Sequence, residues 1–508
     1  MHSNSIYGKF KSGTDIRGVA SEGVEGQHVN LTDEVCRAIV SGFLLWLSEK
    51  TGKSPASLRL AVGHDSRISA KRIKAAAIHS ITEAGASVLD SGLSSTPSMF
   101  MITLDEKLDG AIQITASHHP YNRNGLKFFT PEGGLEGEDI SDILSRCDRG
   151  ETPPAVGGGE CVPINYMDKY SERLRELIKR EVNAADYHKP LSGFKIAVDA
   201  GNGAGGFYAG KVLSPLGADV SGSYFLEPDG MFPNHIPNPE DKEAMAAITR
   251  AVISSESDLG VIFDTDVDRA GAVDRTGEEI NRNRLIALSA AIVLEDNKGA
   301  TIVTDSTTSA GLKEFIEGTL GGKHYRYRRG YRNVINKAIE LNKAGEDCPL
   351  AIETSGHAAL RENYFLDDGA YLVTKIIITF AKLRQEGEGK TLDSLTSSLP
   401  VPLEEMELRI PIAAENFGEY GGEVLRELER YAGTQDGWII ADDNREGIRV
   451  TVGENGWFLL RLSVHDPIMP LNLESEREGG CKLLAAALMN AIKSFDKLKL
   501  TAVEEFLN

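Results

Sequence analysis

Short apolar runs that end in an aspartate recur three times along the chain. They are residues 60–65 (LAVGHD), 196–199 (IAVD) and 302–305 (IVTD). Each is followed further on by a second apolar run with polar residues at its end, at residues 111–114, 259–263 and 350–352. Segments with helical spacing, such as 70–85 and 241–253, lie between these runs. The pattern predicts one α/β unit with parallel strands, used three times.

The chain beyond residue 400 has a different pattern. Residues 405–411 are strand-like, 418–433 are helical, and short strand-like runs occupy 438–462, which indicates a smaller α+β domain. The turn-rich segment 151–159 is a candidate linker. The polar segment 384–390 and the prolines at 400 and 402 indicate that a different domain begins near there. We therefore expect an α/β protein of four domains, at residues 1–155, 156–278, 279–398 and 399–508. The first three share a mixed or parallel topology.

Composition narrows the class of protein. A chain of 508 residues exceeds the roughly 250–300 residues at which a single core stops growing. No apolar run approaches the roughly 18 residues of a membrane span, and residues 1–10 lack the apolar region of a signal peptide, so we expect a cytoplasmic protein. The five cysteines have no metal-ligand spacing, and we expect them to be reduced and structural. A net charge of −20 disfavours nucleic acid as a partner.

Three aspartates alternate with other residues after an apolar strand-like run. In extended backbone Asp264, Asp266 and Asp268 share one face, and a slight curl turns three oxygens toward one ion. At about 4 Å and an effective dielectric near 20, each carboxylate pair repels by roughly 4 kcal/mol, so converged acids imply a divalent cation such as Mg²⁺. An EF-hand is excluded because Arg269 and Arg275 occupy its glycine and glutamate positions. A haloacid-dehalogenase-like phosphatase is the enzymatic alternative, although Asp268 departs from its pattern.

Ser117 follows a strand-like run and is adjacent to His118. No Gly-x-Ser-x-Gly elbow surrounds it, so triad chemistry is disfavoured. A phosphorylated Ser117 would carry a charge near −2, and its oxygen could bind the metal held by the three aspartates. The local charge would then be about −5 against +2, so cations must lie nearby. The candidates are Arg17, His118, Lys127 and Arg269. The alternative is a strand-end serine in a turn.

Three further motifs bear on ligand binding. Residues 201–206 match G-x-G-x-x-G, but they lack a well-placed ribose-binding acid, so we expect a tight turn rather than an NAD site. Glu353 and Ser355 can bind adjacent sugar hydroxyls and His357 can act as acid or base, although a capping glutamate and a satisfied histidine explain them equally well. The basic aromatic run 325–332 could pair with RNA, but holding a phosphate is the preferred interpretation.

Taken together, these motifs resemble those of the α-D-phosphohexomutase superfamily over most of the chain. Residues 13–18 (GTDIRG) are similar to its opening motif, residues 115–120 and 124–127 to its phosphoserine loop, and residues 264–269 to its magnesium loop. Residues 353–357 are similar to its sugar-binding loop. Residues 330–332 are similar to a shorter element that binds the phosphosugar.

The resemblance implies four domains around a central cleft and an isomerase. That enzyme would move a phosphoryl group between C1 and C6 of a hexose phosphate (mannose or glucose phosphate) through a phosphoserine and a hexose bisphosphate. Its partners would be these small molecules, and it would be a monomer or small homo-oligomer. The expected catalytic residues are Ser117, His118, Lys127, Arg17, Arg269 and His357. The expected Mg²⁺ ligands are Ser117, Asp264, Asp266 and Asp268. The expected substrate-binding residues are Glu353, Ser355, Gly330, Tyr331, Arg332, Arg461, Ser463 and His465.

Two segments depart from the family pattern. His119 stands where asparagine is usual. The phosphate loop of the fourth domain reads RLSVHDP at residues 461–467, so that Arg461 and Ser463 keep two phosphate donors while Asp466 adds a negative charge. This loop therefore leaves open how the phosphate at the far end of the substrate is bound. It also leaves open which hexose phosphate is the substrate. A magnesium-dependent sugar phosphatase and a catalytically weak sugar-phosphate-binding protein are the functional alternatives.

Overall fold

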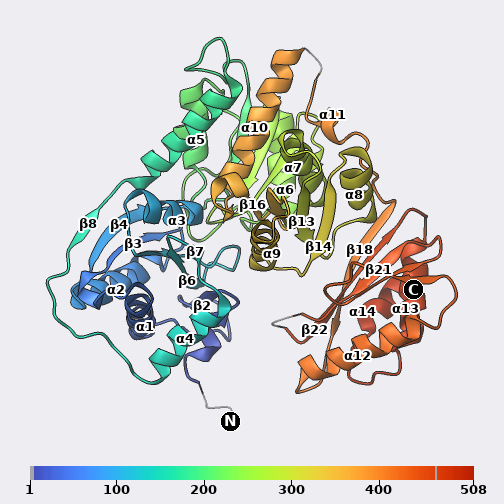
Figure 1. Ribbon diagram of the computed structural model, residues 1–508, viewed down its shortest axis with the longest axis horizontal. Helices are drawn as coiled ribbons and strands as arrows, with labels where there is room; N and C mark the ends of the chain where they lie inside the picture. Colours follow the sequence, from blue (N-terminus) through green and yellow to red (C-terminus); the bar gives the residue numbers. More distant parts are fainter. Residues whose placement is uncertain (1–4, 388–389, 464–465) are drawn as a thin grey trace. The chain divides into compact units, whose positions relative to one another are not determined.

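The computed structural model describes residues 5–387, 390–463 and 466–508. Figure 1 labels its helices and strands. The chain forms two compact units: unit 1 comprises Met1–Leu285 and Ser355–Ser394, and unit 2 comprises Ile286–Thr354 and Leu395–Asn508. The chain passes between the units inside helix α7 (Arg282–Asp296), after Thr354, and inside the short helix α11 (Asp393–Thr396).

The first sheet of unit 1 has the strand order β1-β2-β6-β5-β3-β4-β8, with β7 paired to β6. Its strands are β1 (Lys11–Ser12), β2 (Asp15–Val19), β3 (Arg59–His64), β4 (Ser87–Leu93), β5 (Gly110–Ile114), β6 (Arg123–Thr130), β7 (Gly133–Gly134) and β8 (Cys161–Pro163). Strand β3 runs parallel to β4 and β5, whereas β6 runs antiparallel to β2 and β5. The predicted strands at 60–65 and 111–114 are therefore neighbours, and their carboxyl ends lie at the same edge of the sheet.

Helices α1 (Asp33–Thr51), α2 (Ala70–Glu83) and α4 (Gly137–Asp148) share one apolar core with this sheet. Helix α3 (Thr96–Asp105) contacts β3, β5 and β6 outside that core. Local sequence sets the ends of α1. The Thr32 side chain accepts the backbone N–H of Val35 at its start, and Gly52 ends it with a φ of 68°, a conformation that glycine adopts without a steric cost.

The second sheet of unit 1 has the order β12-β11-β10-β9. Its strands are β9 (Ile196–Asp199), β10 (Leu259–Phe263), β11 (Ala270–Asp274) and β12 (Glu279–Ile280). Strands β9 and β10 are parallel, and β10 and β11 are antiparallel. Helix α6 (Lys242–Ser255) shares an apolar cluster with these strands, and α10 (Gly369–Glu386) contacts β10, β11 and α5 (Tyr166–Val182). A short hairpin, β16 (Ala358–Leu360) and β17 (Leu366–Asp367), leads into α10.

Unit 2 contains a parallel arrangement and an antiparallel sheet. Strand β13 (Thr301–Asp305) pairs in parallel with β14 (Lys323–Tyr327) and β15 (Leu350–Ile352), and α9 (Tyr331–Lys343) packs on them. The second sheet has the order β18-β22-β21-β20-β19 and is antiparallel throughout. Its strands are β18 (Glu404–Pro411), β19 (Trp438–Ile440), β20 (Ile448–Val452), β21 (Trp457–Leu460) and β22 (Ile468–Ser475). Helices α12 (Phe417–Ala432), α13 (Gly480–Ile492) and α14 (Thr501–Leu507) share its core.

The predicted fold class is confirmed: three α/β parts are followed by a smaller part with an antiparallel sheet. The first two α/β parts are mixed, as the expected mixed or parallel topology allows, because β6 and β11 run against their neighbours. Helix α10 continues to Glu386, so the polar segment that starts at Arg384 begins inside that helix. Among the described helices, none combines the length and apolar character that crossing a membrane requires.

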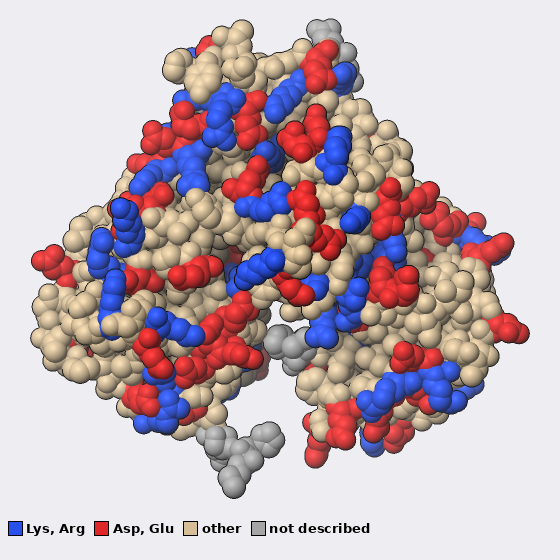
Figure 2. Space-filling view, in the orientation of Figure 1, with Lys and Arg blue, Asp and Glu red and all other residues tan. Residues whose placement is uncertain are grey.

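Charged side chains of both signs lie on the face of the molecule that Figure 2 draws. Acidic and basic side chains are interspersed over that face. Unit 1 has surface ion pairs such as Lys211 with Asp168 at 2.6 Å and Lys169 with Glu106 at 3.0 Å. Because exposed pairs contribute only about 0–1 kcal/mol each, the buried cores and not these pairs carry the stability of unit 1.

A buried histidine makes the stability of unit 1 depend on pH. His235 Nε2 lies 3.1 Å from both carboxylate oxygens of Asp199, at the end of β9. Burial alone would lower the pKa of His235, but the hydrogen bond to Asp199 and its charge outweigh burial and raise that pKa. A raised pKa means that the stabilisation is fully present below the unfolded value of about 6.5. It is lost as pH rises through the folded value.

We therefore expect His235→Gln to lower the free energy of unfolding by roughly 1–3 kcal/mol near pH 6 and by less near pH 9. Urea unfolding of both proteins at the two pH values measures this difference. His79→Gln, at an exposed histidine on α2, is the control and should change little at either pH. An equal loss for His235→Gln at both pH values would contradict the assignment.

Candidate functional site

Three adjacent strands of the first sheet carry or precede predicted site residues. Ser117 follows the end of β5, Lys127 lies on β6 opposite Gln113 of β5, and Arg17 lies on β2 opposite Gly125 of β6. A side chain at Gly125 is impossible without movement, because a Cβ atom there would lie 2.1 Å from the Ile16 carbonyl oxygen. The glycine therefore lets β2 approach β6 and sets Arg17 beside the strand that carries Lys127.

The acidic segment after β10 is a turn, which corrects the expected extended strand. Val267 has a φ of 68°, a left-handed conformation that is a genuine outlier for a β-branched residue. Its N–H donates to the Asp264 carbonyl oxygen at 3.3 Å. The turn nevertheless achieves the convergence that was expected: ligand oxygens of Asp264, Asp266 and Asp268 all lie within 4.8 Å of one another. All three residues are buried.

The loop after β5, residues 117–123 and called the serine loop below, contacts this acidic turn through Ser117. Ser117 Oγ donates to Asp264 Oδ2 at 3.0 Å, and Arg269 Nη2 donates to Ser117 Oγ at 2.9 Å. The same Nη2 lies 2.7 Å from His118 Nδ1, which accepts from it. Ser117 has a φ of 50° and is buried. The backbone therefore holds its hydroxyl between an acid and a guanidinium rather than in solvent.

Basic side chains lie beside the acidic turn, and its carboxyl groups differ in the direction of their pKa shifts. Lys127 Nζ donates to Asp268 Oδ2 at 2.5 Å and lies 3.8 Å from Asp266. Burial alone would raise the pKa of Asp268, but the charges of Lys127 and His357 outweigh it and hold that pKa well below its usual value. Burial, followed by repulsion from Asp268 and Asp266, raises the pKa of Asp264 well above its usual value. Without a further cation, three ionised acids are therefore not stable in this turn.

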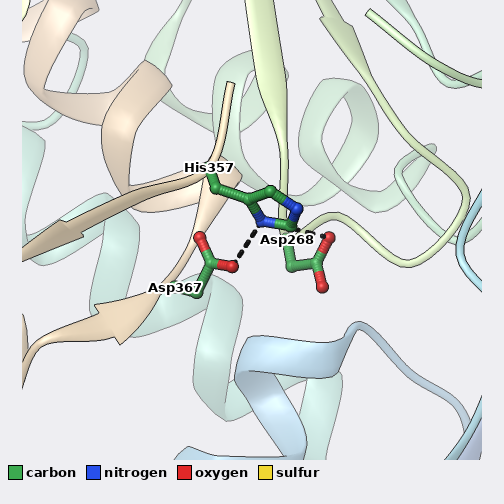
Figure 3. Close-up of side chains that lie close together, drawn as sticks. All are labelled: Asp268, His357 and Asp367. Atoms are coloured by element: carbon green, nitrogen blue, oxygen red, sulfur yellow. Dashed lines mark hydrogen bonds and ion pairs between the residues drawn. The ribbon is translucent and has the colours of Figure 1, made fainter. Parts of the chain in front are cut away.

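His357 lies between two carboxylates, as Figure 3 shows. Its Nδ1 donates to Asp367 Oδ2 at 2.5 Å and lies 3.9 Å from Asp268 Oδ1. Burial would lower the pKa of His357, but the charges of Asp367 and Asp268 outweigh burial and raise it to about 9. Gly356, at a φ of 90°, allows this approach because its backbone lies against the Ala270 carbonyl oxygen. The imidazole is therefore protonated at neutral pH.

The acidic turn fits a divalent cation. Asp266 Oδ1 and Asp268 Oδ1 are buried, and neither has a hydrogen-bond partner among the described residues. A buried carboxylate oxygen without a partner is costly, and a set of oxygen donors is what hard dications prefer. The oxygens of Asp264, Asp266 and Asp268 thus fit a divalent cation, and Ser117 Oγ lies next to them.

Two other predicted residues lie at the edge of this cluster. Arg17 is half-buried and donates to Asp15 at 3.0 Å. His118 is an exposed residue, yet desolvation by surrounding atoms, followed by the charge of Arg269, lowers its pKa to about 2. Desolvation, followed by the charge of Arg17, also lowers the pKa of the neighbouring His119 to about 3. Both histidines are therefore neutral hydrogen-bonding groups at physiological pH.

The predicted substrate-binding residues are divided between the units. In unit 2, Glu353 Oε1 accepts the Gly330 N–H at 2.6 Å, which joins the predicted sugar loop to the start of α9 with Tyr331 and Arg332. Arg461 follows β21, and the Ser463 hydroxyl accepts the Asp466 N–H at 3.3 Å. Ser355 belongs to unit 1 and is buried. His465 lies outside the described residues.

Sequence reasoning missed two residues that hold the cluster in place. Thr96 begins α3, and its hydroxyl donates to Asp266 Oδ2 while its N–H donates to the Asp266 carbonyl oxygen. Asp367 holds His357, as described above. The Ser95-Thr96-Pro97 start of α3 is readable as a helix cap, but no local signal tells which distant residue a capping hydroxyl contacts.

The first residue of helix α10 contacts the backbone of the acidic turn. The Gly369 N–H donates to the Val267 carbonyl oxygen at 3.1 Å, and a Cβ atom at Gly369 would lie 2.7 Å from the backbone of Arg269. We expect Gly369→Ala to displace the turn and weaken divalent-cation affinity by about 10-fold to 100-fold. Calorimetric titration with Mn²⁺ measures this change. Gly210→Ala, where a Cβ atom meets nothing within 4 Å, is the matched control, and an unchanged affinity in Gly369→Ala would refute the prediction.

Comparisons with known proteins agree with this geometry. Models of phosphoglucomutase/phosphomannomutase alpha/beta/alpha domains I, II and III match residues 9–153, 168–277 and 281–402. A phosphomannomutase/phosphoglucomutase of Pseudomonas putida is 30% identical over 421 residues, covering 83% of this chain and 84% of that protein. A phosphoglucomutase of Neisseria gonorrhoeae is 28% identical over 481 residues, covering 94% and 96% respectively.

Among solved structures, a phosphoglucomutase/phosphomannomutase family protein from Burkholderia thailandensis is similar with a TM-score of 0.76 and 25% identity. The match covers 100% of this chain and 99% of that one. The expected superfamily is thus confirmed, and with it the class of enzyme. The chain belongs to the phosphoglucomutase/phosphomannomutase family of the α-D-phosphohexomutase superfamily and is an isomerase.

Proposed function

We propose that this protein reversibly transfers a phosphoryl group between C1 and C6 of a hexose phosphate, mannose or glucose phosphate, with Ser117 as the residue that carries the phosphoryl group. The observation that carries the proposal is the contact of Ser117 Oγ with both Asp264 at 3.0 Å and Arg269 at 2.9 Å. His118 Nδ1 lies 3.3 Å from Ser117 Oγ, but it already accepts from Arg269 Nη2 at 2.7 Å, which disfavours it as a base for a hydrolytic serine. The serine does have a cation site and a guanidinium that suit an attached phosphate.

The charges around Ser117 explain why a phosphoryl group would be stable there and still transferable. Mg²⁺ bound by Asp264, Asp266 and Asp268 would supply electrostatic stabilisation of the charge that develops during transfer. Arg269 donates to Ser117 Oγ and remains beside it when the oxygen becomes a bridging ester atom. Lys127, paired with Asp268, lies on the same side of the turn. The chain therefore places its own cations around the anion that the reaction moves.

Each half of the reaction exchanges one O–P bond for another. In the first half, the Oγ–P bond breaks and a bond forms between phosphorus and a sugar hydroxyl oxygen. That hydroxyl gives up its proton, and Ser117 Oγ takes one up. In the second half, the bond between the other phosphoryl group and its sugar oxygen breaks and a bond to Ser117 Oγ forms. Ser117 Oγ then gives up its proton, and the sugar oxygen takes one up. We assign these proton transfers to His357 and Lys127. His357 is protonated at neutral pH because Asp367 and Asp268 face it, so it is placed to be the donor.

Residues of unit 2 supply the groups that a sugar phosphate needs. Glu353 offers a carboxylate for sugar hydroxyls next to the basic start of α9, with Arg332. Arg461 and Ser463 offer phosphate donors, although the Ser463 hydroxyl accepts from the Asp466 N–H. These unit 2 residues are proposed to bind a hexose phosphate and, between the two half-reactions, a hexose bisphosphate. In unit 1, Ser355 is the residue proposed to bind sugar hydroxyls.

The proposal predicts that Ser117 carries a phosphoryl group in the working enzyme. Ser117→Ala should abolish labelling by a hexose 1,6-bisphosphate and lower kcat on hexose 1-phosphates by about 10⁴-fold or more, because the phosphoryl carrier is removed. Intact-protein mass spectrometry and a coupled mutase assay measure the two effects. Ser48→Ala, at a surface serine that donates to the Lys53 carbonyl oxygen, is the control.

An active Ser117→Ala variant would exclude the proposed function. Release of inorganic phosphate by the wild-type enzyme, without isomerised sugar, would identify a phosphatase instead. Tight binding of hexose phosphates without turnover would identify a binding protein.

A further inference from the structure

Arg67 is a fully buried cation that no step of the proposed reaction uses. It follows β3 by three positions, and its side chain has no exposed surface. Its Nε lies 3.3 Å from Asp65 Oδ2, and its own N–H donates to Asp65 Oδ1 at 2.9 Å. Burial alone disfavours a guanidinium in this place, so the contacts made by its remaining nitrogens must account for its position.

Those nitrogens donate hydrogen bonds to backbone carbonyl groups of the serine loop. Nη1 donates to the carbonyl oxygens of Pro120 at 2.7 Å and Arg123 at 3.0 Å. Nη2 donates to the carbonyl oxygens of His119 at 2.6 Å and of Ser117 itself. One planar guanidinium thus fixes four carbonyl groups between residues 117 and 123. A planar fork can satisfy this arrangement, whereas the single ammonium of lysine cannot reach four acceptors spread over two directions.

The Ser117 backbone needs such a restraint. Its φ of 50° is left-handed, and a non-glycine residue there costs on the order of 1–3 kcal/mol unless its surroundings hold it. The Ser117 N–H donates to the Thr115 hydroxyl at 2.9 Å, and Arg67 holds the carbonyl group on the other side of the same residue. Together the two contacts define both peptide planes that flank the Ser117 side chain and so decide where Oγ points.

Arg67 is itself held by the segment of unit 1 that precedes α6. The Phe232 ring lies 5.2 Å from the guanidinium carbon, and Gly230 forms a bridge with Arg67. A Cβ atom at Gly230 would lie 2.4 Å from the Ile68 nitrogen and from the Ser66 carbonyl oxygen. Only glycine allows this approach. The segment that carries Gly230 and Phe232 belongs to the same part of the chain as the acidic turn, so Arg67 ties the serine loop to that part.

We propose that Arg67 is a positioning residue for phosphoryl transfer: it fixes the Ser117 backbone so that Oγ faces the acidic turn, without touching the reacting atoms. This inference rests on the proposed function of Ser117. It predicts that loss of the fork slows transfer and leaves the binding of sugar phosphate intact, because unit 2 residues and not Arg67 are proposed to hold the sugar.

Arg67→Lys keeps the charge and removes the fork. We expect kcat to fall at least about 100-fold while KM for a hexose 1-phosphate stays within about threefold. The phosphorus-31 resonance of the phosphorylated protein should also shift. The matched control is Arg72→Lys in the same domain, where an arginine donates to the carbonyl oxygens of Ala20 and Leu31, both at 2.9 Å, and pairs with Asp33. There kcat and the resonance should stay close to wild type.

If Arg67 only stabilised the fold, the expected effect of Arg67→Lys on activity would be different. Activity would then fall only in proportion to the folded fraction, and kcat per folded molecule would equal that of Arg72→Lys. That result would overturn the inference. If Arg67→Lys does not fold, Gly230→Ala decides, because it keeps Arg67 and displaces its support: a lower kcat at unchanged KM supports the inference, and an unchanged kcat overturns it. Absence of transfer in the wild-type enzyme would instead reject the proposed function of Ser117.

Discussion

Three buried carboxylates in one turn repel one another, and the structure of the site follows from how that repulsion is offset. Lys127 pairs with Asp268, Arg269 pairs with Asp264, and His357 lies charged beside Asp268. These cations are still insufficient, because burial and repulsion keep the pKa of Asp264 raised and two carboxylate oxygens remain without hydrogen-bond partners. The cluster therefore fits a divalent cation, and in the proposed function that cation acts on the oxygen of Ser117, which lies against Asp264.

The fold produces this cluster by bringing strand ends together under strain. Ser117 follows β5 and the acidic turn follows β10, and both segments contain a non-glycine residue with left-handed backbone, Ser117 and Val267. Each such residue costs on the order of 1–3 kcal/mol. Contacts from three directions hold the strained turns: Thr96 at the start of α3, Gly369 at the start of α10, and Arg67 after β3. Groups held in one arrangement before the substrate arrives need no reorganisation during transfer.

Much of this could be read from the amino-acid sequence, and the limits have a physical origin. Apolar runs such as 196–199 and 259–263 gave strands β9 and β10 because periodicity reports burial. The chemistry of Asp264, Asp266 and Asp268 was readable because converging acids demand a cation. The shape of their turn was not, because nothing in the local propensity of Val267 signals a positive φ. Arg67 and Thr96 act through contacts with residues 50 and 170 positions away along the chain, and such contacts leave no local pattern.

The central claim is that an esterified Ser117 and the three aspartates share one divalent cation. The most direct measurement compares the affinity of phosphorylated and dephosphorylated protein for Mg²⁺ by titration calorimetry. A phosphate oxygen adds a charged ligand at the site, so the phosphorylated form should bind at least about tenfold more tightly, a difference of about 1.4 kcal/mol. Equal affinities in the two forms would contradict the account, because the serine and the acids would then act as separate groups.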